Sequence, residues 1–448
     1  MKKKSFFASV IGIAVPVGLQ SMLQSSFSMI DQLMVGQLGT TAVSAVEVAG
    51  RPAFIYSVVT GAVAAIAGIM ISQYLGMKDE DMADRSLSVN AAITAALAAV
   101  FTVLCLLVPE KIVGIFVGDA PEIRSAGGAY LRIILWTYLP MGLASILAVM
   151  IRCRDKAVWP LVAGITSAVV NTLLNYVLIF GHLGCPAMGV TGAAIASVVS
   201  QLVNLLLIFF MFCALRRGRG FHFNLRVGKT FWSQYLSMLW PLLVTEFLWS
   251  LGQNVNTFIY GHLAPGDLAA MSMTGPIQGL FTGALSGVAQ AAGILIGKRL
   301  GAGQYREAYG ESKKLVGYGL IGSLILSAVL IGVRGFYVTL YNVEPQVQET
   351  AGMLLLAFAI LAPVKVANMI LGGGVVRSGG KTAYIMVIDV VGTWLVGVPL
   401  GLVTAFVFHM PVFWVYFILS QEEFVRLIMT VFVFKRGGWM NRLEAARD

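Results

Sequence analysis

Apolar residues recur along the chain in long runs that are separated by short polar or basic stretches. A run of about 20 apolar residues is long enough to cross the hydrocarbon core of a bilayer as an α-helix, whereas membrane β-strands are about half as long and alternate. The runs predict about twelve membrane helices, near residues 9–38, 43–75, 86–108, 123–150, 157–181, 190–215, 232–262, 268–297, 310–335, 348–375, 383–408 and 412–434. The expected fold class is an all-α polytopic membrane protein.

Composition supports this class. The 448 residues are 58% hydrophobic and 12% charged, about half the charged fraction of a typical soluble domain. The basic start of the chain, Lys2 to Lys4, followed by an apolar stretch is similar to a signal peptide. No small-residue cleavage site ends that stretch, however, and the apolar run continues, which favours a first membrane helix.

The basic residues are distributed unequally between the two ends of the predicted helices. Most of the 31 Lys and Arg residues fall at one end, in the N-terminus, 76–86, 151–156, 215–231, 298–314, 377–381 and the C-terminus. Only Lys111, Arg124 and Arg334 fall at the other end. The positive-inside rule then places both termini in the cytoplasm, so the net charge of +10 reflects topology and not nucleic-acid binding. The expected location is a bacterial inner (cytoplasmic) membrane, with the lipid bilayer as partner.

The two halves of the chain are copies of each other. The segment AGIMISQYLG (67–76) matches AGILIGKRLG (292–301), and the same offset of 225 residues pairs Pro16 with Pro241 and Arg152 with Arg377. Six helices in each half preserve orientation, so the repeats are parallel, as in several transporters. The predicted domains are an N-terminal lobe (1–215), a basic cytoplasmic linker (216–231) and a C-terminal lobe (232–448), with substrate expected between the lobes.

Polar residues form one stripe on the first helix of each copy. The stripes are Gln20, Gln24, Ser28 and Asp31 in the first copy, and Glu246, Ser250, Gln253 and Thr257 in the second. Residues at this helical spacing share one face, and that face must avoid lipid because lipid offers no hydrogen bonds. At the repeat offset Asp31 corresponds to Asn256 and Glu246 to Ser21, so the ionisable groups of the two copies have different tasks.

Asp31 is the strongest candidate functional residue. A carboxylate at the centre of a membrane helix costs about 2.5–3.5 kcal/mol on insertion scales, and such residues commonly mark ion pathways. The surrounding sequence, from about Ser9 to Leu38, contains no cation that would neutralise it. Burial favours the neutral form of a carboxylic acid. Asp31 is therefore predicted to take up and release a proton.

Other ionisable or amide residues inside predicted helices allow simpler interpretations. They are Glu47 with Arg51, Asn171 with Asn175, Lys365 and Asp389. The first two are spaced i, i+4, which favours a self-neutralising pair on one helix. Asn171 and Asn175 share a face and can join helices through hydrogen bonds. Lys365 is either a counter-charge of Glu246 or Asp389, or part of a site.

The remaining chemistry argues against an enzyme. The cysteines (Cys105, Cys153, Cys185 and Cys213) and the histidines (His182, His222, His262 and His409) are scattered, without the spacing of a metal or haem site. GILIGKR (293–299) and SGGKT (378–382) do not fit the phosphate-loop pattern. Neither a cofactor nor a firm metal site is expected beyond a coupling ion, H⁺ or Na⁺. A channel is disfavoured because two diverged copies do not form a symmetric filter.

Several segments together resemble the multidrug and toxic compound extrusion (MATE) family, and its DinF-like branch in particular. They are SMIDQLMVGQLG (28–39), NTLLNYVLIFG (171–181), MGVTGAAIASVVSQ (188–201), GKRLGAGQYREA (297–308) and VVRSGGKTAYIMVID (375–389). The resemblance implies two six-helix lobes. It also implies export of organic cations and other amphipathic small molecules in exchange for H⁺ or Na⁺.

The resemblance assigns roles in the first lobe. Asp31 matches the aspartate that binds the coupling ion, Asn171 the asparagine beside it, and Pro16 the proline at which the first helix bends. Ser197 occupies a position where threonine is common. Asn175 departs from the aspartate of many relatives. A Na⁺ site at Asp31, Asn171 and Asn175 would therefore have one formal charge, and H⁺ is the favoured coupling ion.

In the second lobe Glu246 roughly matches a glutamate used by another branch, but Lys365 lies near the place of that branch's second carboxylate. The expected substrate-facing or second-lobe network comprises Gln24, Ser28, Glu246, Gln253, Lys365 and Asp389. The chain is expected to act as a monomer. The closest alternative is a lipid or lipid-linked saccharide flippase, and an integral membrane enzyme is the more distant one.

Overall fold

The structure is a computed structural model that describes residues 5–117, 120–216, 223–264 and 266–444. Over these residues every regular element is helical, which confirms the predicted fold class. Some residues used in the topology argument, among them Lys2 to Lys4, Arg217 and Arg219, lie outside the described residues. The cytoplasmic placement of the termini stays a prediction.

The chain packs as two compact units. One comprises residues 1–22, 72–79 and 227–448, and the other comprises residues 23–71 and 80–226; we call them the C-terminal unit and the N-terminal unit. These units follow packing, whereas the predicted lobes 1–215 and 232–448 follow the sequence repeat. The chain passes from one unit to the other within its first long helix, between Met22 and Leu23.

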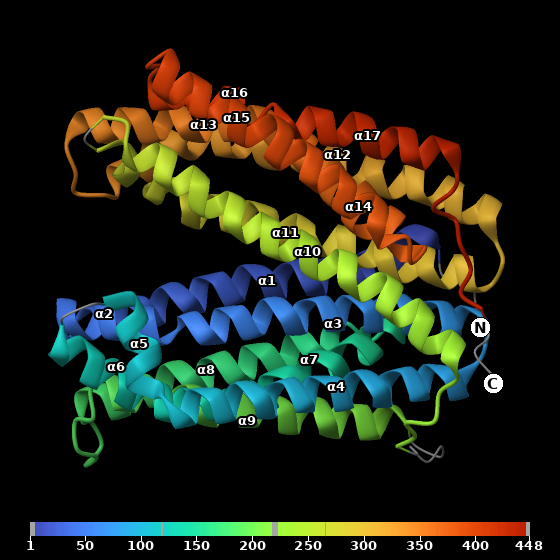
Figure 1. Cartoon of the computed structure of the whole chain (residues 1–448), viewed down its shortest axis with the longest axis horizontal. Coiled ribbons are helices and arrows are strands. Elements are labelled where there is room, and N and C mark those ends of the chain that lie inside the picture. The colour runs from blue at the N-terminus through green and yellow to red at the C-terminus, as the bar shows by residue number, and fades with distance from the viewer. Residues whose placement is uncertain (1–4, 118–119, 217–222, 265, 445–448) are drawn as a thin grey trace. The chain divides into compact units, whose positions relative to one another are not determined.

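The first half of the chain begins with a continuous helix that contains Pro16. Its elements are α1 (Phe6–Gly36), α2 (Thr40–Ala49), α3 (Arg51–Gly76), α4 (Glu80–Leu107), α5 (Pro109–Val117), α6 (Pro121–Ile134), η1 (Leu135–Thr137), α7 (Tyr138–Cys153), α8 (Val158–Phe180) and α9 (Val190–Leu215). In the N-terminal unit α7 packs on α4 and α9, and α8 packs on α9, as Figure 1 also shows. Three details differ from the prediction. The helix expected at 43–75 is interrupted at Gly50, the helix expected at 123–150 contains the 3₁₀ segment η1, and the short helix α5 was not expected.

The second half of the chain contains three π-helical segments. Its elements are α10 (Lys229–Gly261), α11 (Asp267–Gly301), α12 (Tyr305–Thr339), α13 (Pro345–Asn368), η2 (Met369–Val376), α14 (Thr382–Asp389), η3 (Val390–Gly397), α15 (Val398–Leu402), η4 (Val403–Val407), α16 (Val412–Leu419) and α17 (Glu422–Arg436). The segments η2, η3 and η4 are the π-helices. The helix expected at 412–434 is divided at Ser420 and Gln421. Because π-helical turns often lie at functional sites, η2 and η3 direct attention to the side chains around them.

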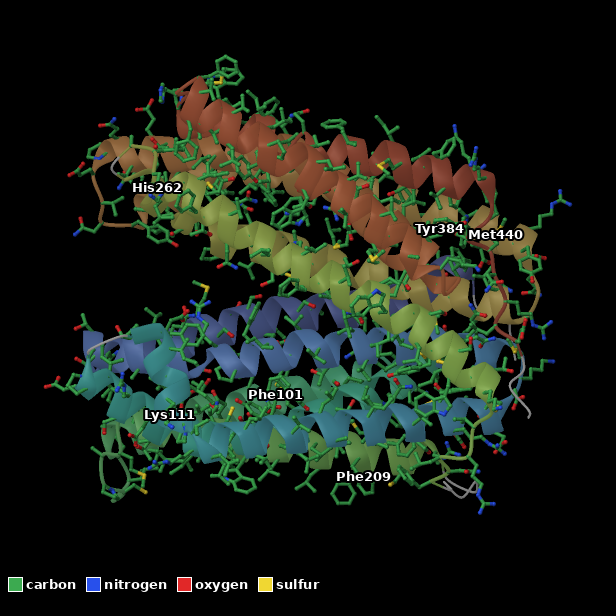
Figure 2. The ribbon with its side chains drawn as sticks, in the orientation of Figure 1. Phe101, Lys111, Phe209, His262, Tyr384 and Met440 are labelled. Carbon is green, nitrogen blue, oxygen red and sulfur yellow. The ribbon has the colours of Figure 1, made fainter. Side chains whose placement is uncertain are left out.

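Ten helical spans of the described residues are long and apolar enough to cross a membrane. Helix α10, and the pair α16 and α17, add two further segments, which agrees with the predicted number of about twelve. Large apolar side chains lie on the outside of these helices: Phe209 of α9, for example, is 49% exposed and projects outward in Figure 2. Such side chains suit contact with lipid. The chain is therefore a multi-pass membrane protein.

Glycines allow close helix crossings in the C-terminal unit. A Cβ atom on Gly76 would collide with the Lys298 carbonyl, and one on Gly301 would collide with the Gln73 carbonyl. Both pairs, Gly76 with Gly301 and Gln73 with Lys298, are separated by the repeat offset of 225 residues. The segments 67–76 and 292–301, the two copies of the repeated sequence, therefore cross at their C-terminal ends. Each glycine packs against a backbone carbonyl of the other copy, as small residues permit in membrane helices.

Candidate functional site

The first polar cluster joins α1 to α8 in the N-terminal unit. The Asn175 side-chain nitrogen donates to Asp31 Oδ1 at 2.8 Å and lies 3.2 Å from Asn171 Oδ1. Asn175 is only 2% exposed. Asn171 and Asn175 are one helical turn apart, so their amides reach the same carboxylate. The structure thus brings together Asp31, Asn171 and Asn175, the residues that the family resemblance implied for the coupling ion; their role in coupling stays a prediction.

The Asn171 amide has two useful orientations. In one, its nitrogen lies 3.5 Å from Ser197 Oγ and 3.4 Å from Ser200 Oγ. In the other, its nitrogen donates to Asp31 at 2.9 Å (Oδ1) and 3.0 Å (Oδ2). A side-chain amide presents a donor or an acceptor depending on its rotation. In the second orientation Asn171 joins Asn175 as a donor to Asp31.

Serine residues hold α8 against α9 beside this cluster. Ser167 Oγ donates to the Ser200 carbonyl at 2.7 Å, and Ser200 Oγ donates to the Ser197 carbonyl at 2.9 Å. Ser167 and Ser200 were not predicted from the sequence. Their helical spacing was the available signal, since Ser200 lies one turn after Ser197 and Ser167 one turn before Asn171. They fix the rotation of α8 and α9, and with it the direction of the amides.

The cluster contains one formal negative charge. Among the described residues Asp31 forms no ion pair with a basic side chain. Asn175 Oδ1 is buried without a hydrogen-bond partner. A carboxylate within a membrane helix that has no basic partner is the type of group that can take up a proton or a small cation.

The other residues predicted on the first helix lie in different surroundings. Gln24 and Ser28 are on the part of α1 that belongs to the N-terminal unit, whereas Pro16 is buried inside α1. Proline lacks a backbone N–H and weakens the helix at its position, which suits the predicted bend. The bend itself, and the role of Gln24 and Ser28 toward substrate, stay predictions.

A second cluster lies in the C-terminal unit. A cavity of about 430 Å³ is lined by side chains from α10, α13, η2, α14 and α17, including Glu246, Gln253, Lys365 and Asp389. The structure therefore gathers the four residues that the sequence assigned to the second lobe. One detail differs from the expectation. Asp389 forms an ion pair with Arg426, whereas the sequence offered Lys365 as its counter-charge.

Sequence reasoning missed several members of this cluster. Arg377, Glu423 and Arg426 also line the cavity. Arg426 Nη1 lies 3.6 Å from Glu423 Oε1, and Asn368 donates to Glu423 Oε2 at 2.8 Å. The i, i+3 spacing of Glu423 and Arg426 was a signal for an ion pair, but no sequence pattern indicated that Asp389 would join it.

Glu47 and Arg51 form the expected pair. Arg51 Nη2 lies 2.8 Å from Glu47 Oε1, with half or more of each side chain exposed. An exposed i, i+4 pair contributes about 0.3–0.5 kcal/mol. The pair links the end of α2 to the first residue of α3.

Two parallel repeats of membrane helices, each with ionisable groups inside the membrane-spanning part, define a membrane transporter. The MatE family profile matches residues 16–177 and again residues 241–403. The two matches begin at Pro16 and Pro241, the residues that the repeat offset pairs. The chain belongs to the MatE family of MATE transporters.

Named relatives extend over most of the chain. The probable multidrug resistance protein NorM of Rhizobium meliloti is 25% identical over 90% of this chain and 87% of its own length. The protein of that name from Thermotoga maritima is 24% identical over 98% of this chain and 94% of its own. The structure of the Vibrio cholerae MATE transporter VcmN in its bent form matches with a TM-score of 0.86 at 16% identity, over 97% of this chain and 98% of that one. The last likeness establishes the two-lobe fold; the DinF-like branch stays a prediction.

Proposed function

We propose that this protein is a secondary active antiporter that exports organic cations or amphipathic drugs and toxins in exchange for protons. Relatives over nearly the full chain carry the name multidrug resistance protein, which supports multidrug export. We further propose that it works as a monomer in a bacterial cytoplasmic membrane, with both termini in the cytoplasm and without a cofactor.

The observation that carries the proposal is the Asp31 cluster. A lone carboxylate accepts a hydrogen bond from the Asn175 amide, lies within hydrogen-bond distance of the Asn171 amide and has no basic partner among the described residues. A fixed basic partner would keep Asp31 permanently ionised, whereas a turning amide stabilises either form. The charge on Asp31 is thus free to change during transport.

Proton exchange at Asp31 changes the hydrogen bonds around it. Ionised Asp31 accepts from Asn175 and from the Asn171 nitrogen. Protonated Asp31 donates its O–H to the Asn171 oxygen, whose nitrogen then turns toward Ser197 and Ser200. The proton thereby shifts the balance between two arrangements of α1 and α8. A membrane potential of 100 mV supplies about 2.3 kcal/mol for each proton that crosses, which drives export against a gradient.

Sodium is the alternative coupling ion, and one observation favours it. Asn175 Oδ1 is buried without a partner and could join the Asp31 carboxylate and the Asn171 oxygen around Na⁺. This donor set contains one carboxylate, and only three side-chain donors are evident. Hard cations usually take about six oxygen ligands. Proton coupling therefore fits the residues better.

Glu246 is proposed to favour cationic substrates. It lines the second cavity, and its neighbours Phe247 and Trp249 are exposed aromatic side chains, 66% and 47% respectively. Carboxylates and aromatic faces both attract organic cations. Substrates without charge would depend on the aromatic contacts alone.

Transport by purified protein in proteoliposomes tests the proposal. A pH gradient without Na⁺ is expected to drive uptake of a fluorescent cationic dye into inside-out-oriented vesicles, and a Na⁺ gradient at equal pH is not. The reverse result would contradict proton coupling. In that case Asn175→Asp, which adds a second carboxylate, should lower the Na⁺ concentration needed for half-maximal transport.

A further inference from the structure

The chain also passes from one unit to the other near the end of α3. Residues 23–71 belong to the N-terminal unit, whereas residues 72–79 belong to the C-terminal unit; we call residues 72–79 the α3 end. The distribution of basic residues predicts that this end is cytoplasmic. Because α3 is one helix up to Gly76, a contact that holds the α3 end in the C-terminal unit also restrains the chain of the N-terminal unit.

One side chain of the α3 end is enclosed by the C-terminal segment of the chain. Gln73 is fully buried. Its amide nitrogen donates to the Ser378 carbonyl at 2.8 Å and to the Asn441 carbonyl at 3.2 Å, and its amide oxygen accepts from the Leu443 N–H at 2.8 Å. A side-chain amide offers two N–H donors and one carbonyl oxygen. Gln73 therefore uses both its nitrogen and its oxygen on backbone groups of the C-terminal unit.

The segment that encloses Gln73 comprises residues 437–443, which we call the strap. It turns away from α17 at Gly437, whose φ of 74° is left-handed, a conformation that commonly ends helices. A Cβ atom on Gly379 would collide with the Trp439 carbonyl, so the strap lies directly on the turn that follows Ser378. Met440 of the strap is labelled in Figure 2.

The strap differs from the corresponding part of the first half. At the repeat offset of 225 residues, strap residues 439–441 correspond to residues 214–216. Helix α9 continues to Leu215, so the first half is still helical where the second half has already turned into the strap. At the same offset Gln73 corresponds to Lys298, whose ammonium group cannot accept a hydrogen bond. The contact between Gln73 and the strap is therefore not a simple consequence of the duplication.

The hydrogen bonds of Gln73 can be exchanged for hydrogen bonds to water. Arg442 and Glu444, on either side of Leu443, are exposed, so water has access to the strap once Gln73 withdraws. A polar group that loses its partner and stays dry costs free energy, whereas a hydrated one recovers most of that cost. The contact can therefore hold the α3 end and still open reversibly.

We propose that Gln73 and the strap form a latch, which holds the α3 end in the C-terminal unit in one state of the transport cycle and releases it in another. Transporters built from repeats alternate access by moving one repeat against the other. Helix α3 has residues in both units and is drawn into this motion. The latch opposes the motion and thereby favours the latched state. This inference rests on the transporter class and not on the proton as coupling ion.

Distances between spin labels on the two units test the latch without measuring transport. The labels are carried by Lys156→Cys in the N-terminal unit and Lys314→Cys in the C-terminal unit, both exposed positions at the predicted cytoplasmic end, in protein whose four cysteines are replaced by alanine. Pulsed electron paramagnetic resonance in lipid membranes should resolve two populations of distances. Gln73→Leu, which has no amide, should raise the longer-distance population about fivefold, the equivalent of one net hydrogen bond. Gln37→Leu, at an exposed position, is the control and should leave both populations unchanged.

An unchanged distance distribution in folded Gln73→Leu would overturn the inference. A second experiment decides the question if that variant does not fold. A short, cleavable bifunctional reagent that joins Gln73→Cys to Leu443→Cys should stop transport, under whichever gradient of H⁺ or Na⁺ drives it, and cleavage should restore it. Full transport by the joined protein would show that the latch need not open, and the inference would be wrong. If only a Na⁺ gradient drives transport, the proposed proton coupling fails, while the latch is judged by the same two measurements.

Discussion

At the scale of single residues, two aspartates within membrane helices have different partners. Asn175 donates to Asp31, and the Asn171 amide lies within hydrogen-bond distance of the same carboxylate. The second membrane-embedded aspartate, Asp389, instead forms an ion pair with the Arg426 guanidinium. The two aspartates therefore differ in their neighbours and not in their own chemistry.

Asp31→Asn should abolish transport driven by a pH gradient while the protein still folds. The new amide oxygen still accepts from Asn175, so the free energy of unfolding should change by no more than about 1.5 kcal/mol. Dye uptake in proteoliposomes measures the first effect, and thermal unfolding in detergent measures the second. Glu47→Gln, which removes an exposed pair, is the control and should transport normally. Full transport by Asp31→Asn would exclude Asp31 as the coupling residue.

Glu246→Gln should weaken export of cationic dyes more than export of neutral ones. The carboxylate attracts cations, and the adjacent Phe247 and Trp249 serve both kinds of substrate. The ratio of the two transport rates in one proteoliposome preparation is the measurement. An equal loss for both dyes, restored by Lys365→Met, would instead show that Glu246 only balances charge in the cavity that it shares with Lys365.

At the scale of helices, small residues permit contacts that larger ones would prevent. Gly287 of α11 lies so close to the Ala14 carbonyl of α1 that a Cβ atom has no room, and a Cβ atom on Gly18 would likewise collide with the Ala284 carbonyl. Both contacts lie within the C-terminal unit. In this unit α11 therefore packs backbone against backbone with the first part of α1, as membrane helices rich in glycine commonly do.

Gly287→Ala should destabilise the protein by about 1–3 kcal/mol, the usual range for overpacking, because the added methyl group meets a backbone carbonyl that cannot rotate away. Gly275→Ala on the same helix is the matched control, since a Cβ atom there has nothing within 4 Å. It should be neutral or slightly stabilising, because alanine favours helix more than glycine. Thermal unfolding in detergent compares the two, and equal melting temperatures would contradict the close contact.

At the scale of the whole chain, segments far apart in sequence depend on each other. Gln73 donates to the carbonyls of Ser378 and Asn441, at 2.8 and 3.2 Å, and its oxygen accepts from the Leu443 N–H at 2.8 Å. Beside them, Trp439 is fully buried and donates to the Phe434 carbonyl. The C-terminal segment after α17 is thus an integral part of the C-terminal unit.

Trp439→Ala should therefore lower the free energy of unfolding by about 3–5 kcal/mol, the range for removing a large buried aromatic side chain. Ile428→Ala removes a side chain that is 69% exposed and should have a much smaller effect. Unfolding of both variants in detergent provides the comparison. A Trp439→Ala protein as stable as Ile428→Ala would show that the segment after α17 does not support the fold.

Sequence patterns alone were enough to predict the class of protein, the approximate positions of the helices and the internal repeat, and they located the carboxylate of Asp31 within a membrane helix. These features depend on local properties: the length of apolar runs, the distribution of basic residues and the cost of a charge within such a run. The shared face of Asn171 and Asn175 followed from helical spacing. For the same reason the Glu47–Arg51 pair was predicted correctly.

The groups that meet across helices became known only from the folded structure. Arg426 pairs with Asp389, Asn175 reaches Asp31, and Glu422 lies over Gly397 with one oxygen unpartnered. These contacts join residues far apart in the sequence, and they depend on how each helix is rotated and how closely it approaches its neighbour. Local sequence does not set rotation or approach, because both result from packing many side chains together. The neighbours of a carboxylate, and hence whether it can carry a proton, are therefore properties of the folded chain.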